Sequence, residues 1–271
     1  MSYATLLVVS DLNPKSANRL KIAADLAQRF KARVIGIAAQ AVVLPLSLAQ
    51  SDAFADADVW AQSQAEIAKL LQEIEERFRG AFKDLGTPIE WRSEVTEPVP
   101  FIARESRAAD LIIAGKDLDD TLLDPSDLVL QAGRPALLIP NETESLKAER
   151  LLIAWKDTRE ARRAIHDALP LLRQSQKIIV AEIDEDENPA AAARRVADVV
   201  AWLASHGVNA DGVSEAATTS PAAQLDQIAA REDADIIIAG AYGHGRFREW
   251  VFGGVTHDLF LKSSRTQFFA H

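Results

Sequence analysis

Glycines gather late in this sequence, directly after a short apolar run. Five of the twelve glycines are Gly240, Gly243, Gly245, Gly253 and Gly254. Glycine adopts positive φ readily and has no side chain to keep backbone N–H groups away from an anion. A helix that begins at Gly253 would add its own unpaired N–H groups, whereas a helix begun near Phe247 would be broken by the glycine pair. The cluster favours contact with a phosphate group over its alternative, a flexible loop with close helix packing.

Two common phosphate-binding loops do not fit this cluster. Gly240-x4-Gly245-Arg246-Phe247 lacks the Lys and the Ser or Thr of a Walker A loop. A dinucleotide loop through Gly243 and Gly245 would have Arg248 in place of its third glycine. The spacing that remains is Gly240-x2-Gly243-x9-Gly253.

Other residue types argue against several kinds of chemistry. The chain has no cysteine, which excludes disulfides, thiolate metal sites and thiol catalysis. Its five histidines show no paired spacing, and no G-x-S-x-G nucleophile elbow is present. The run 184–187 (Asp-Glu-Asp-Glu) is more typical of a solvated loop than of a cation site, because it defines no coordination geometry. We therefore assign no catalytic residue and no metal ligand.

An internal repeat defines the elements that must position the glycines. Residues 109–115 (ADLIIAG) match residues 234–240 (ADIIIAG) at an offset of 125, and Leu6–Val9 matches Leu151–Ala154 at an offset of 145. The first copy therefore carries about 20 extra residues, which we place at 41–60. Two landmarks in the same order, with a polar linker between the copies, indicate a duplication.

Each copy alternates short apolar runs with amphipathic stretches. This pattern predicts an α/β fold of two tandem, doubly wound, five-stranded parallel sheets, with domains at 1–141 and 149–271. Predicted strands of the first copy are 5–10, 33–39, 89–95, 111–115 and 136–139, and its predicted helices are 15–30, 61–85 and 99–107. In the second copy the predicted strands are 150–155, 177–183, 208–215, 235–240 and 266–270, and the predicted helices are 158–173, 189–206, 221–231 and 248–261. Asp110 and Asp235 precede the fourth strand of their copies, which is typical of a turn or cap.

The spacing G-x2-G-x9-G after a fourth strand resembles the nucleotide signature of the universal stress protein (Usp) family. The tandem repeat and the stretch GAYGHGRFREWVFGGVTHDLF extend this resemblance over nearly the whole chain. It implies Rossmann-like domains of the adenine nucleotide alpha hydrolase-like type. It also implies an ATP or AMP ligand, with or without Mg²⁺, and a regulatory role in the stress response, with weak ATPase activity at most.

The resemblance also implies which residues would bind the nucleotide. The phosphates would lie against the glycines, the ribose beside an aromatic residue, and the end of the first strand of the second copy would close the other side. The implied residues are Ala154, Trp155, Lys156, Gly240, Tyr242, Gly243, Gly253, Gly254, Val255 and Thr256. Two residues depart from the family pattern. Gly254 stands where a Ser or Thr is usual, and Lys156 stands where an Asp is usual and would either pair with a phosphate or fill the site.

The first copy departs further from the pattern. Its fourth strand is followed by Lys116 and then by Asp117, Asp119 and Asp120, which would repel a triphosphate, and only Asp11 matches the family's Asp. We expect this copy to have lost the nucleotide site and to pair with the second copy inside the chain, because single-domain relatives pair through their fifth strands. The insertion 41–60 would cap the vacant pocket, cover a homodimer face or bind an apolar ligand.

Net charge and hydropathy indicate which partners and which cellular compartment to expect. A net charge of −10 disfavours nucleic acid and anionic membranes, and no apolar run reaches the ~18 residues of a membrane helix. We expect a cytoplasmic protein that binds a nucleotide as a signal. A nucleotide-free interaction module and a slow ATP hydrolase, with Asp157 as the nearby carboxylate, are the alternatives.

Overall fold

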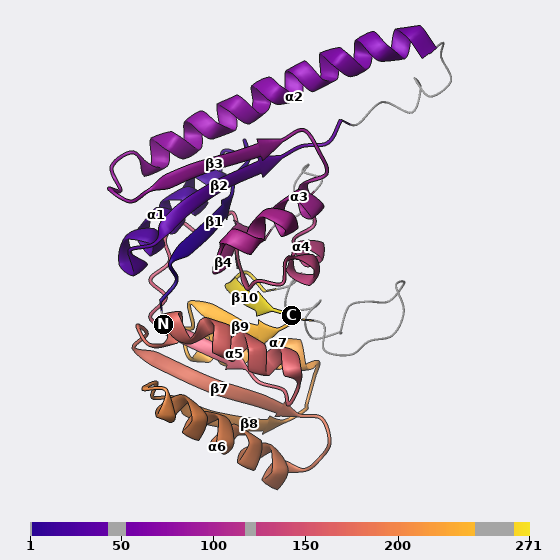
Figure 1. Ribbon diagram of the computed structural model, residues 1–271. Coiled ribbons are helices and arrows are strands. Elements are labelled where there is room, and N and C mark those ends of the chain that lie inside the picture. The colour runs from indigo at the N-terminus through magenta and orange to yellow at the C-terminus, as the bar shows by residue number, and fades with distance from the viewer. Residues whose placement is uncertain (1, 43–52, 117–122, 242–262) are drawn as a thin grey trace.

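A computed structural model describes residues 2–42, 53–116, 123–241 and 263–271. The ten strands described in these ranges form one sheet in the order β3-β2-β1-β4-β5-β10-β9-β6-β7-β8 (Figure 1). We call residues 2–139 the first half and residues 150–271 the second half. The order is the same in each half, counted outward from the centre of the sheet, so the two halves are related by a pseudo-two-fold axis.

The first half contains five strands and four α-helices among its described residues. Its elements are β1 (Thr5–Val9), α1 (Ser16–Phe30), β2 (Arg33–Ala39), α2 (Ala53–Phe82), β3 (Ile89–Glu94), α3 (Pro98–Glu105), β4 (Leu111–Gly115), α4 (Pro125–Ala132) and β5 (Ala136–Ile139). In the second half, the elements are β6 (Arg150–Ala154), α5 (Arg159–Leu172), β7 (Lys177–Asp184), α6 (Pro189–Ser205), β8 (Asp211–Ala216), α7 (Pro221–Arg231), β9 (Ile236–Gly240) and β10 (Thr266–Ala270).

Strands are parallel within each half, and the halves meet through an antiparallel pair. β5 and β10 pair with Leu137 opposite Phe268, so the sheet is continuous across the chain. The predicted α/β class with parallel five-strand units is confirmed. The domain limits 1–141 and 149–271 stay a prediction.

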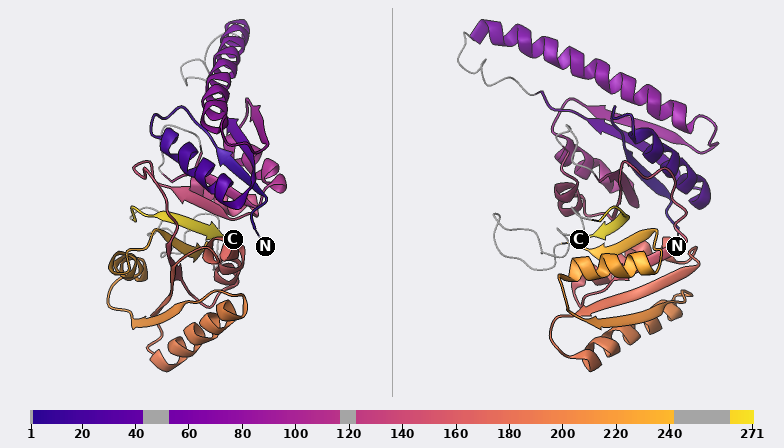
Figure 2. Two further views of the ribbon diagram at one scale, coloured as in Figure 1. Left: turned by 90° about the vertical axis from the view of Figure 1, so that its left-hand side faces the viewer. Right: turned by 180° about the vertical axis from the view of Figure 1, so that it is seen from behind.

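Helices cover both faces of the sheet (Figure 2). One face carries α1, α2, α5 and α6, and most of its buried residues form one hydrophobic cluster that runs through both halves, from Leu6 and Val8 of β1 to Ile236 and Ile238 of β9. Leu71 and Ile74 of α2 form a small separate cluster with Ala38 of β2. The other face has two separate clusters, one under α3 and α4 and one under α7. Burying this apolar surface is the main force that holds the two halves as one sheet.

Aspartates before the fourth strands have the same role in both halves. Asp110 Oδ2 accepts hydrogen bonds from the backbone N–H groups of Ala4 and Thr5 at 2.7 and 3.0 Å. Asp235 Oδ2 accepts them from Glu149 and Arg150 at 2.7 and 2.9 Å. Each carboxylate thus anchors the start of the first strand of its half. The role is structural, but it differs from the predicted local turn or cap, because each carboxylate bonds to a strand start that is distant in the sequence.

Helix boundaries agree with the sequence in most places and differ in two. Side-chain caps by Thr158, Asn188 and Ser220 begin α5, α6 and α7 close to the predicted residues. α2 begins at Ala53, eight residues before the predicted start at 61, so part of the predicted insertion is helical. α4, which Asp124 caps, was not predicted. The predicted helix 248–261 lies outside the described residues.

Polar contacts join the halves away from the central strands. The phenol of Tyr3, at the start of the first half, donates to the backbone oxygen of Asp167 in α5 at 2.8 Å. The Arg29 guanidinium at the end of α1 donates to Gln174 Oε1 and to the backbone oxygen of Lys147, both at 2.7 Å. Near the central strands, Lys116 Nζ donates to the backbone oxygen of Ser263. These contacts hold the halves in one orientation.

Among the described helices, including the 30-residue α2, none combines the length and the apolar character needed to cross a bilayer.

Candidate functional site

Two of the predicted nucleotide-binding residues end neighbouring strands in the second half. Ala154 is the last residue of β6 and lies opposite Ala239 of β9, so Gly240 is one residue further along the adjacent strand. Strand order reverses between β6 and β9, and ligands of doubly wound sheets bind at this point, outside the carboxyl ends of the strands. The structure therefore brings Ala154 and Gly240 together where a ligand site is expected.

Gly240 is also required for packing, a role that the sequence analysis missed. A Cβ atom at this position would lie 2.6 Å from the carbonyl carbon of Glu160 and would also contact the backbone of Ala161, in the first turn of α5. Backbone atoms cannot move aside as the end of a long side chain can, so only glycine allows α5 to approach β9 this closely. Glycine at this position therefore does not depend on a phosphate ligand.

Lys156 extends from the end of β6 toward solvent. Its Nζ lies 2.7 Å from Glu185 Oε2, and its side chain is 58% exposed. Which of the two roles considered for this lysine holds, pairing with a phosphate or filling the site, stays a prediction. An exposed ion pair contributes only about 0–1 kcal/mol, so a small free energy suffices to turn this ammonium toward another anion.

Trp155 is buried between the strand end and the helices. Its backbone N–H donates to the oxygen of Ala181 at 2.8 Å, and its indole Nε1 is buried without a hydrogen-bond partner. The ring belongs to the continuous core and also lines a groove of about 430 Å³ between α5 and α6, together with the partly exposed Trp202. Trp155 thus packs against the helix layer. Its role as an adenine contact stays a prediction.

Six further predicted contacts lie outside the described residues. They are Tyr242, Gly243, Gly253, Gly254, Val255 and Thr256.

A large cavity lies at the carboxyl ends of β1 and β2, in the first half. Its volume is about 940 Å³, and α2, α3 and the segment after β1 supply much of its wall. This is within the size range of small-molecule sites, about 300–1,000 Å³. The sequence predicts a half that has lost its nucleotide site and keeps a vacant pocket. The size of this cavity depends on how α2 and α3 lie against the strand ends, which the sequence pattern does not contain.

Asp11 lines this cavity and forms an ion pair with a buried arginine. The Arg19 guanidinium in the first turn of α1 forms a hydrogen-bonded ion pair with its Oδ2. Arg19 is 4% exposed, and a Cβ atom at Gly115 would collide with its Nη1. The one residue of this half that matches the family's Asp therefore already has a cationic partner.

Solved structures of similar fold cover nearly the whole chain. A universal stress protein from Archaeoglobus fulgidus DSM 4304 superposes with a TM-score of 0.70 at 16% identity, over 98% of this chain and 95% of that one. A putative universal stress protein from Pseudomonas aeruginosa UCBPP-PA14 gives 0.63 at 15% identity, over 99% and 93%. The chain has the universal stress protein fold. A functionally unknown protein from Pseudomonas aeruginosa PAO1 has the same fold, with a TM-score of 0.64 at 13% identity, over 99% and 92%.

Sequence comparisons alone find no relative of this chain. No protein-family model matches it, and no curated protein matches it. At identities of 16% or less, the similar structures establish the fold and leave the ligand to be argued from the residues.

In this universal stress protein fold, the acidic run after β7 is used within the protein. Asp184 Oδ1 accepts a hydrogen bond from the backbone N–H of Asp186 at 3.1 Å, and Glu185 pairs with Lys156. Within the described ranges, no group of three or more His, Asp and Glu side chains is arranged to hold a metal ion.

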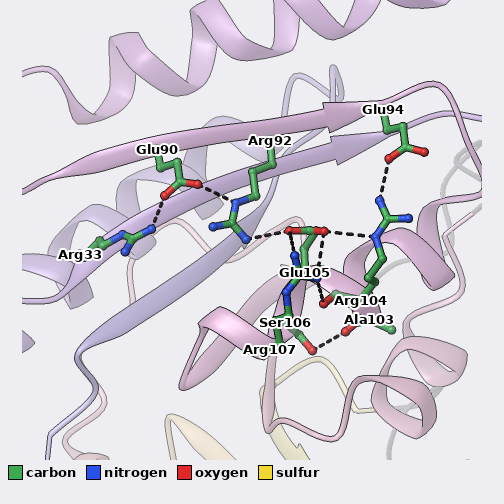
Figure 3. Close-up of polar contacts among 9 residues, drawn as sticks. All are labelled: Arg33, Glu90, Arg92, Glu94, Ala103, Arg104, Glu105, Ser106 and Arg107. Atoms are coloured by element: carbon green, nitrogen blue, oxygen red, sulfur yellow. Dashed lines mark hydrogen bonds and ion pairs between the residues drawn. The ribbon is translucent and has the colours of Figure 1, made fainter.

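A second charged cluster joins β3 to α3, away from the cavity lining (Figure 3). Arg92 bridges Glu90 at 2.7 Å and Glu105 at 2.8 Å, and Glu105 also pairs with Arg104 and Arg107. Burial raises the pKa of Glu105, but hydrogen bonds from Arg104 and Arg107 outweigh it and hold the pKa below its usual value. The cluster satisfies its own charges, so we treat it as structural.

Proposed function

We propose that this protein is a regulatory protein of the stress response that binds one adenine nucleotide in its second half. The observation that carries this proposal is the pairing of β6 with β9, which puts Ala154 and Gly240 side by side at the reversal of strand order. The exposed ammonium of Lys156 follows Ala154 by two residues. The spacing Gly240-x2-Gly243-x9-Gly253 continues from the end of β9. These three features suit a phosphate group: the end of a parallel strand, glycines that leave backbone N–H groups accessible, and an exposed cation.

In this proposal, Lys156 exchanges its carboxylate partner for a phosphate. The present partner, Glu185, is 42% exposed, so water solvates it readily once the ion pair opens. Lysine binds phosphate as a point charge without fixed geometry, and this accommodates ATP or AMP, with or without Mg²⁺. The Lys156 ammonium then places a positive charge at the position where the family pattern has the negative charge of an Asp.

The nucleotide would act as a signal. A ligand shifts a conformational equilibrium only by its difference in affinity for the two states. Here the site adjoins β9, which pairs with β10, and β10 pairs with β5 of the first half. Binding at the end of β9 would therefore bias a surface that spans both halves and that a cytoplasmic partner, or a second copy in a homodimer, would recognise.

Native mass spectrometry of freshly purified protein tests this proposal, followed by nucleotide analysis of the denatured supernatant. We expect one adenine nucleotide per chain, or one added on titration with ATP or AMP. Lys156→Glu should weaken ATP binding by about tenfold or more, because it replaces an attraction with a repulsion. Lys21→Glu, a matched charge reversal at an exposed position of α1, should leave ATP binding unchanged.

Two outcomes would support other functions. A protein that is empty and does not bind ATP or AMP at millimolar concentration would be a nucleotide-free interaction module. Turnover of ATP that Asp157→Ala abolishes without changing affinity would indicate a hydrolase. Asp157 is 56% exposed and pairs with Arg162 at 2.8 Å.

A further inference from the structure

The 940 Å³ cavity of the first half has a mainly apolar wall, and the described part of its lining contains no cationic side chain. Its lining residues are Val9, Ser10, Asp11, Leu12, Asn13, Pro14, Ala39, Gln40, Ala41, Ser63, Glu66, Ile67, Leu70, Ile74, Pro98, Ile102 and Leu123. Aliphatic side chains of α2 form one side, and Ile102 of α3 lies on another. A site of this composition binds its ligand mainly through burial of apolar surface.

The two carboxylates of the lining differ in how they are balanced. Asp11 is paired with the buried Arg19 and is close to neutral as a unit. Glu66 lies on an exposed part of α2, and its Oε1 accepts a hydrogen bond from the neutral Gln62 amide at 3.0 Å. Among the described residues, no ion pair joins Glu66 to a cation. Glu66 therefore gives the cavity one uncompensated negative charge at its α2 side.

Two cations close to the cavity are held by other partners. Arg77 on α2 donates to the backbone oxygen of Leu12 at 2.9 Å. The Lys15 ammonium pairs with Glu142. Both charged side chains of the described lining are carboxylates, so the lining itself presents a negative field, and this disfavours phosphates and carboxylates.

We propose that this cavity binds an amphipathic amine, with its apolar body among Leu70, Ile74 and Ile102 and its single ammonium at Glu66. Each buried methylene of such a ligand contributes about 0.8 kcal/mol, so a chain of several methylenes binds without any further polar contact. The ammonium gains a charge-assisted hydrogen bond to the Glu66 carboxylate. The site is separate from the nucleotide site of the second half, and the proposal does not rest on that function.

Three probes of equal chain length test the charge preference: decylamine, decanol and decanoate, each titrated into the full-length protein below its aggregation concentration at pH 7. We expect one decylamine per chain, about tenfold tighter than decanol, and no saturable binding of decanoate. An alkyl ammonium keeps its charge at this pH, as the lysine side chain does.

Variants of α2 locate the site. Glu66→Gln should lower the affinity for decylamine to that for decanol and leave decanol binding unchanged, whereas Glu73→Gln, an exposed carboxylate on the same helix, should change neither. Ser63→Trp should fill the cavity from a half-buried position and weaken both ligands at least tenfold, with Gln64→Trp as the exposed control one residue away. Circular dichroism checks that each variant remains folded.

Several results would overturn this proposal. Decanoate binding as tightly as decylamine would show that the lining does not select charge. A Glu73→Gln effect equal to that of Glu66→Gln would show attraction to the acidic surface instead of a site. Failure of all three probes to bind would show that the cavity takes no amphipathic ligand. None of these outcomes bears on ATP binding, which Lys156→Glu tests on the other half.

Discussion

The two halves have the same strand order and the same anchoring aspartates, yet they differ beneath the last residue of the fourth strand. In the first half, Gly115 lies over the Arg19 guanidinium, which neutralises Asp11. In the second half, Gly240 lies over the backbone of α5, and the charge at the end of the first strand is Lys156, which extends into solvent. In the first half, a buried arginine balances the carboxylate at the strand end, and the cavity beside it is mainly apolar. In the second half, the exposed Lys156 is a cation that a ligand can reach. The two halves therefore share their strand order and their anchoring aspartates, and they differ in the residues at the ends of the first and fourth strands.

The largest expected effect comes from adding a methyl group at these two glycines. Gly240→Ala places Cβ against backbone atoms of α5 and should lower the free energy of unfolding by about 2–3 kcal/mol, as overpacking does. Gly115→Ala meets the Arg19 side chain, which can shift, so its cost should be smaller. Urea denaturation of both variants checks the difference. Equal costs would mean that the two strand ends are equally crowded.

Glu105 gives the next largest effect, and it depends on pH. Because the pKa of this carboxyl is lowered in the folded protein, its stabilisation is present above the unfolded pKa, near 4.5, and is lost as the pH falls below that value. Glu105→Gln should cost about 1–2 kcal/mol at pH 7 and progressively less at acid pH. Glu215→Gln breaks an exposed pair with Arg231 on the corresponding edge of the second half and should cost less than about 0.5 kcal/mol.

A cost for Glu105→Gln that stays constant from pH 7 to pH 3 would contradict its role as a charged partner. Chemical denaturation at a series of pH values measures it.

Tyr3→Phe tests a contact between the halves. It removes the hydrogen bond from the phenol to the Asp167 backbone oxygen and should cost about 1 kcal/mol. Burial raises the pKa of the Tyr3 phenol well above its usual value, so Tyr3 should be the last of the two tyrosines to ionise in a spectroscopic titration. A normal titration of both tyrosines would show that the N-terminal contact opens in solution.

The smallest effect on stability is expected at Lys156. Lys156→Ala removes an exposed pair with Glu185 and should change the free energy of unfolding by less than about 0.5 kcal/mol. Thermal unfolding without ligand measures this, and the same variant should lose part of the stabilisation that ATP provides. A large loss without ligand would mean that Lys156 is structural.

Much of the fold could be predicted from the sequence because the strands are continuous apolar runs. Residues 111–115 and 136–139 form strands with the predicted limits, as expected for segments buried on both faces. The start of α2 was missed because residues 41–60 have no counterpart in the second copy and were assigned to an insertion. α4 was also missed, although Asp124 followed by Pro125 is a typical helix start.

The candidate sites were less predictable, because they depend on what other elements place nearby. Glycine spacing indicated the end of β9 but not that α5 needs Gly240 for packing. The pairing of Arg19 with Asp11 joins residues eight apart across a loop and a helix start, which no periodicity marks. The first-half cavity exists because α2 passes over the ends of β1 and β2, a tertiary relation that the sequence pattern does not contain.

Hydrogen exchange of the intact chain with and without ATP tests the difference between the halves most directly. The account predicts that ATP slows exchange in peptides at the end of β6 and in residues 240–256, and leaves the segment after β1 unchanged. Slowed exchange at residues 9–14 and 39–41 instead would place the nucleotide in the first half and contradict the account.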